Sequence, residues 1–136
     1  MAQPMSAADR RAGDPAGGGE RSVAAVLAAL DAGQPPPRAE LRTAVRYLLD
    51  LLAARAPGRA IEVRVPPYAA VQCGEGPRHT RGTPPNVVET DPVTWIRLAT
   101  GRLTWAEASG SGQVAASGVR ADLSAFLPVV PPPAVR

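Results

Sequence analysis

Two stretches of the sequence carry side chains that could bind or react, and the first is short and basic. Arg78, His79 and Arg81 lie close together and include the only histidine of the chain. Two guanidinium groups beside an imidazole could hold a carboxylate or phosphate head group, because arginine forms paired hydrogen bonds with such anions. Alternatively, the arginines hold a long loop in place by pairing with Glu75, Glu89 or Asp91. A loop of about a dozen residues is longer than most connections, which favours a functional role.

Cys73 is the only cysteine, so neither an intrachain disulfide nor a thiolate zinc site can form. Cys73 and His79 are near in sequence, but no third group is placed to orient them as a catalytic pair. The serines lie in no nucleophile-elbow pattern. We therefore predict no catalytic residue, no metal ligands and no cofactor, with Cys73 acting as a small buried hydrophobe.

The second stretch is a set of large apolar residues in the last third of the chain. The chain has only five aromatic residues, so each is a candidate anchor in the core or in a pocket. We predict an apolar ligand cavity lined by Trp95, Leu98, Leu103, Trp105, Leu123, Phe126 and Leu127. The alternative is that these residues fill a core beneath a sheet, as apolar residues at helical spacing usually do.

Length and charge restrict the possible functions. A chain of 136 residues has room for one ordinary domain, and its net charge is only +3. The basic residues are all arginines, scattered along the chain without interleaved aromatic residues, which argues against nucleic-acid binding. No signal peptide or membrane-spanning stretch is evident, so we expect a cytoplasmic protein.

The elements that would position these residues begin with helices. Residues 1–21 are predicted to be a disordered tail, because three consecutive glycines disfavour a helix there. Ser22 is a candidate N-cap for a short helix ending at Leu30. A longer helix follows, with apolar residues at three- and four-residue steps from Leu41 to Leu52.

Strand patterns come next. Alternating apolar and charged residues predict a half-buried strand over 61–65, and residues 68–73 are a plausible hairpin partner. Residues 74–85 are rich in glycine and proline at both ends and are predicted to be a loop. A third short strand is predicted at 86–89.

The last part of the chain carries clear helix-start signals. Asp91 followed by Pro92 predicts a capped helix, and Thr104 with Glu107 matches a capping box. A fourth strand is predicted at 113–117, a final short helix at 122–127 and a proline-rich tail at 131–136. The predicted domain spans 22–130 and has an α+β arrangement, with helices covering one face of a sheet.

The same motifs resemble the closing half of a sterol-carrier-protein domain. The resemblance rests on the helix opening at Asp91 and on the segments Gly101-Arg102-Leu103, Trp105 to Ala108, Gly112-Gln113-Val114 and Gly118. The string from Glu62 to Arg102 is similar to actinobacterial members of that family. It is more distantly similar to the C-terminal domain of mycothiol-dependent maleylpyruvate isomerases.

This resemblance implies a twisted, mainly antiparallel sheet of about four to five strands, covered by helices that enclose an apolar cavity. It implies a non-enzymatic protein that binds a lipid or fatty-acyl ligand. A second hypothesis is an accessory domain with a vestigial cavity, whose Arg/His loop contacts a protein partner. A third, less favoured, is a subunit of a thiol-cofactor enzyme that needs a separate helical partner.

Overall fold

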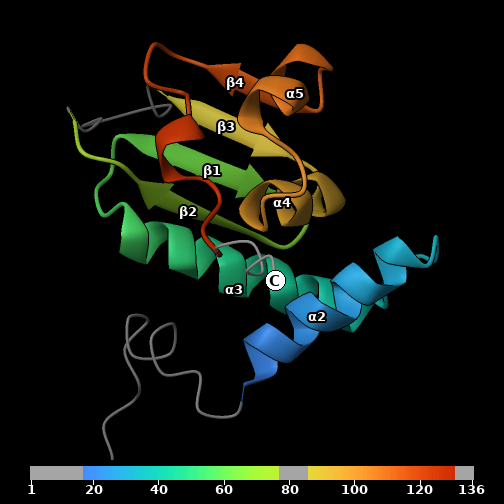
Figure 1. Ribbon diagram of the computed structural model, residues 1–136. Helices are drawn as coiled ribbons and strands as arrows, with labels where there is room; N and C mark the ends of the chain where they lie inside the picture. Colours follow the sequence, from blue (N-terminus) through green and yellow to red (C-terminus); the bar gives the residue numbers. More distant parts are fainter. Residues whose placement is uncertain (1–16, 77–85, 131–136) are drawn as a thin grey trace, which may run out of the picture.

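The computed structural model describes residues 17–76 and 86–130, which form an α+β domain (Figure 1). Its elements are the helices α2 (Gly18–Asp31), α3 (Arg38–Arg55), α4 (Pro92–Ala99) and α5 (Trp105–Gly110), the 3-10 turn η1 (Ser124–Phe126), and the strands β1 (Ile61–Val65), β2 (Ala69–Cys73), β3 (Val87–Thr90) and β4 (Val114–Ser117). The predicted fold class and all four predicted strands are confirmed. Arg78, His79 and Arg81 lie outside the described residues, as do residues 1–16 and 131–136 of the predicted tails.

The four strands form one open, mixed sheet in the order β2-β1-β3-β4. The pairs β1–β2 and β3–β4 are antiparallel, whereas β1 and β3 are parallel. Ile61 pairs with Cys73 and Val65 with Ala69, so β1 and β2 form the predicted hairpin. The side chain of Asn86, at the start of β3, is buried and donates to the carbonyl of Ala60 at 2.9 Å.

Among residues 17–76 and 86–130, helices and the C-terminal segment cover one face of the sheet and leave the other open. In Figure 1, α4 and the C-terminal segment lie over the near face, and α3 runs beneath β2. Ile61, Val63 and Val65 of β1 are buried on the covered face, as their alternation predicts. Glu62 and Arg64 are half-buried on the opposite face, where they form an ion pair.

Helices α2 and α3 pack against each other, and α2 begins four residues earlier than Ser22. The predicted tail is therefore wrong from residue 18 to 21, which is helical. A Cβ on Gly19 would lie 2.2 Å from Cδ1 of Tyr47, so the missing side chain lets α2 approach α3 closely. This tertiary contact outweighs the low helix propensity of glycine.

Helix α4 starts as its sequence predicts. The Asp91 side chain accepts the backbone N–H of Thr94 at 3.0 Å, and Pro92 occupies the first turn. Trp95 is completely buried, and its indole N–H donates to the carbonyl of Val45 at 3.3 Å. Helix α4 is thereby tied to α3 through the centre of the core.

The predicted final helix over 122–127 is wrong, since only the single turn η1 forms there. The Asp122 carboxylate accepts the backbone N–H of Ser124 at 2.8 Å, which favours a local turn. Pro128 also disfavours a helical conformation at Leu127. The chain then turns toward the end of α4, where the N–H groups of Val129 and Val130 both donate to the carbonyl of Ala99. Among the described residues, no helix is both long and apolar enough to cross a membrane.

Candidate functional site

A groove opens between the α4–α5 connection and the C-terminal segment. Its volume is about 360 Å³, and it is lined by Leu98, Gly101, Leu103, Thr104, Trp105, Ala106, Ser124, Leu127 and Pro128. This volume lies at the low end of the range of ligand pockets, about 300–1,000 Å³. Most of the lining is apolar, as in pockets that bind small ligands.

The groove brings together four of the seven residues predicted to line a cavity: Leu98, Leu103, Trp105 and Leu127. Trp95 and Leu123 do not line it, because both are fully buried in the core. Phe126 is half-buried and lies near Gly74, at the end of β2. The structure thus separates the two tryptophans, with Trp95 in the core and Trp105 half-exposed in the groove.

The α4–α5 connection forms one wall, and short backbone hydrogen bonds hold its shape. The N–H groups of Arg102 and Leu103 both donate to the carbonyl of Arg97, at 2.9 and 3.2 Å. Gly101 has a φ of 81°, a left-handed conformation that favours glycine. This turn directs Leu103 toward the groove and the Arg102 guanidinium toward Asp31 of α2, with which it forms an ion pair.

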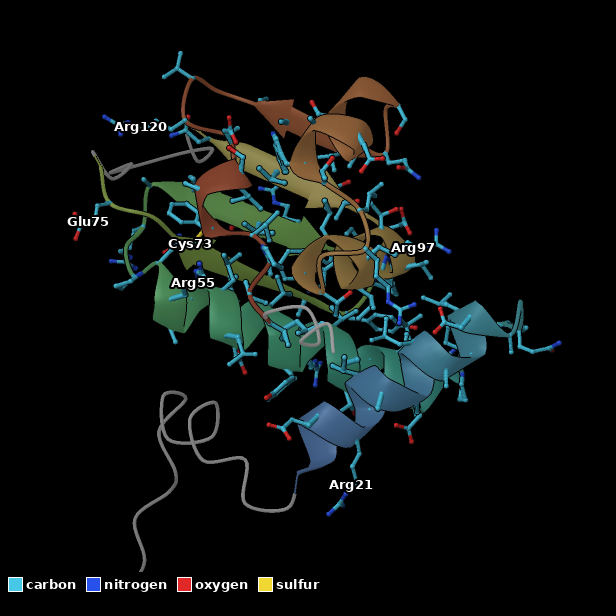
Figure 2. The ribbon with its side chains drawn as sticks, in the orientation of Figure 1. Arg21, Arg55, Cys73, Glu75, Arg97 and Arg120 are labelled. Carbon is cyan, nitrogen blue, oxygen red and sulfur yellow. The ribbon has the colours of Figure 1, made fainter. Side chains whose placement is uncertain are left out.

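The C-terminal segment forms the opposite wall. The N–H groups of Val129 and Val130 both donate to the carbonyl of Ala99, at 3.0 and 3.2 Å. Arg55, near the end of α3, donates to the carbonyl of Pro128 at 3.1 Å. Figure 2 shows Arg55 on the side of α3 that faces the sheet and this segment. Contacts to two helices therefore hold the wall that carries Leu127 and Pro128.

The lining includes two residues with hydroxyl groups, Thr104 and Ser124, and each is hydrogen-bonded to a carboxylate through its hydroxyl or its backbone N–H. The Thr104 hydroxyl donates to Glu107 at 2.8 Å and accepts the Glu107 N–H at 3.1 Å, which completes the predicted capping box. The backbone and hydroxyl of Thr104 lower the pKa of Glu107. The Ser124 N–H donates to the Asp122 carboxylate at 2.8 Å, and the hydroxyl and N–H of Ser124 lower the pKa of Asp122.

Two smaller hollows differ in character from the groove. One, of about 290 Å³, lies between α3 and β2 and is lined partly by Arg46 and Asp50. The other, of about 310 Å³, lies on the uncovered sheet face at β3 and β4, beside the exposed Glu89. Neither includes any residue of the predicted cavity.

Cys73 is buried at the end of β2, as expected for a small hydrophobe (Figure 2). Burial raises the pKa of its thiol to about 11, so the reactive thiolate is scarce at neutral pH. Within 17–76 and 86–130, no cluster of histidine, cysteine and carboxylate side chains is suited to holding a metal ion.

Sequence patterns alone did not identify Gly101, Thr104, Ala106, Ser124 and Pro128 as lining residues. Thr104 carried a signal, the capping box, but that motif locates a helix start and not a groove. Ser124 and Pro128 carried none, because their contribution depends on where the C-terminal segment lies in the fold.

A family model described as "Bacterial SCP ortholog" matches residues 37–129, which is more than half of the chain. The match begins just before α3 and leaves α2 outside it. Comparison with the curated proteins gives no match.

Proposed function

Starting from the fact that this chain belongs to the bacterial sterol-carrier-protein ortholog family, we propose that it binds a small apolar ligand in the groove between the α4–α5 connection and the C-terminal segment. The ligand is an alkyl or acyl chain, and the protein carries it without altering it. The observation that carries the proposal is the groove itself, which gathers Leu98, Leu103, Trp105 and Leu127 around one opening.

The lining has the properties that such binding needs. Leu98 is almost fully buried and forms a closed apolar floor, whereas Leu103, Trp105 and Leu127 are only half-buried. An alkyl chain placed among them would bury its own surface together with that of these side chains. Each methylene buried in this way contributes about 0.8 kcal/mol, so a chain of moderate length could bind without any strong polar contact.

The tryptophans provide a direct test. Decanol and related single-chain ligands are titrated into the protein, and indole fluorescence is followed together with the melting temperature. We expect the emission of Trp105 to change on binding, because this residue lines the groove, and the melting temperature to rise by mass action. In Trp105→Phe the remaining Trp95 should report little change, because Trp95 is fully buried in the core.

Lipids that copurify with the protein give an independent measurement by mass spectrometry. A protein that carries no lipid and shows neither a fluorescence change nor a thermal shift with any alkyl ligand would contradict the proposal. A vestigial groove in an accessory domain would then be the better explanation.

A further inference from the structure

We propose that the groove selects ligands with an uncharged oxygen head group, such as an alcohol, over fatty-acid anions. This inference rests on the proposed function, because it specifies the ligand class of the same site. It follows from two carboxylates that lie next to the polar lining residues, and from the hydrogen-bond donors and acceptors of the lining that remain available to a ligand.

The first carboxylate belongs to Glu107. Its Oε1 atom lies 2.8 Å from the Thr104 hydroxyl oxygen, which belongs to the groove lining. A head group that reached the Thr104 hydroxyl would therefore lie within a few ångströms of a negative charge. The same bond uses the Thr104 hydroxyl hydrogen, so this hydroxyl can offer a ligand only an acceptor lone pair.

The second carboxylate belongs to Asp122. It accepts the backbone N–H of Ser124 at 2.8 Å, and Ser124 lines the groove. Both residues that contribute a lining hydroxyl thus lie directly beside a carboxylate, and each hydroxyl oxygen can accept a hydrogen bond. A fatty-acid anion has acceptors only and carries a like charge, so it meets repulsion at both places.

Two arginines reach this region, but neither lines the groove. Arg102 lies in the α4–α5 connection, and its guanidinium is paired with Asp31 of α2. Arg55 donates to the Pro128 carbonyl from α3. Of these two guanidinium groups, only that of Arg55 lacks a carboxylate partner among the described residues. Its single positive charge is fewer than the two negative charges of Glu107 and Asp122.

An uncharged hydroxyl group on a ligand can pair with the hydrogen-bonding groups that remain available in the lining. It can donate its hydrogen to the oxygen of Thr104 or Ser124, and its own oxygen can accept a hydrogen bond. Trp105 lines the groove, and its indole N–H has no partner among the described residues. An alcohol can serve both groups, whereas an anion can use only the indole.

The test compares three ligands that share one alkyl chain: decanol, decanoate and decylammonium. Each is titrated at neutral pH, decanol below its solubility limit and the two ions below their micelle-forming concentrations, with fluorescence and melting temperature as readouts. We expect decanoate to bind about two- to fivefold more weakly than decanol, because both carboxylates are exposed and water screens their repulsion of the anion. Decylammonium should bind at least as well as decanol.

Glu107→Gln combined with Asp122→Asn tests the cause. Both amides keep an acceptor oxygen for the local backbone bonds, so the domain should fold. Decanoate should then approach decanol in affinity, and decylammonium should lose any advantage. Glu20→Gln, an exposed carboxylate on α2, is the matched control and should leave the three affinities unchanged.

The outcomes separate the two proposals. If no ligand of the three binds, the proposed function fails and the head-group preference fails with it. If decanoate binds as tightly as decanol, the groove still binds alkyl chains but the preference is wrong. Loss of that decanoate binding in Arg55→Gln would then identify Arg55 as the head-group contact.

Discussion

At the scale of single residues, the reactive and hydrogen-bonding side chains in the described part of the chain have mainly structural roles. The Thr104–Glu107 pair closes a capping box, and the Asp91 carboxylate caps α4. The indole N–H of Trp95 satisfies a backbone carbonyl in the core. Cys73 is buried without a charged partner, and burial alone accounts for its raised pKa.

The Cys73 thiol should be unreactive in the folded protein. Its pKa is about 11 instead of the ordinary 9.0, because burial disfavours the thiolate. The buried thiol favours folding fully below pH 9.0, and this contribution is lost as the pH rises toward about 11. We expect slow reaction with a thiol reagent at neutral pH, rising sharply on unfolding. In urea melts, stability should fall over this pH range more steeply than in Cys73→Ala. Rapid labelling of native protein at neutral pH would contradict this.

At the scale of elements, the contact between α2 and α3 depends on the absence of one side chain. Gly18 and Gly19 are adjacent in the first turn of α2, but only Gly19 lies against the Tyr47 ring. Sequence reasoning treated both as helix breakers. The structure gives them different roles, and the adjacent pair forms a controlled comparison.

Gly19→Ala should destabilise the protein by about 1–3 kcal/mol, because the new methyl group would overlap Tyr47. Gly18→Ala adds the same methyl group where no atom lies within 4 Å. It should be neutral or stabilise by up to about 1 kcal/mol, because alanine favours a helix. Free energies of unfolding from urea melts measure both effects. Equal effects of the two substitutions would show that helix propensity, and not packing, governs this position.

At the scale of the whole molecule, α2 is part of the folded domain although the family match begins after it. Val23 and Val26 of α2 are buried and belong to the same apolar cluster as the sheet and α3. The ion pair between Asp31 and Arg102 also connects α2 to the connection that forms one groove wall. We infer that α2 contributes to the stability of the same cooperative unit that carries the groove.

Val26→Ala should lower the free energy of global unfolding by about 1–3 kcal/mol, because Val26 is fully buried. Val119→Ala is the matched control, since Val119 is fully exposed and its substitution should change stability by less than about 0.5 kcal/mol. The circular dichroism signal of the helices, which include α2, and the fluorescence of Trp105 in the groove should change together in a single unfolding transition. A separate early loss of helix, with the tryptophan signal unchanged, would show that α2 unfolds independently.

The patterns of the sequence predicted the fold class and most of the local structure, except the start of α2 and the single turn η1 in place of a last helix. Alternating apolar residues located β1, and the capping signals at Asp91 and Thr104 located the starts of α4 and α5. These succeed because strand alternation and helix capping involve residues only a few positions apart. The apolar set from Trp95 to Leu127 also contained four of the residues that line the groove.

Only the tertiary structure decided how that set divides between core and groove. Trp95 and Trp105 look alike in the sequence, but one contacts Val45 in the core and the other lines an opening completed by Ser124 and Pro128. The parallel pairing of β1 with β3 was likewise absent from the local pattern. Periodicity reports which side chains turn away from water. Which of them meet, and where they leave space, depends on packing between segments far apart in the chain.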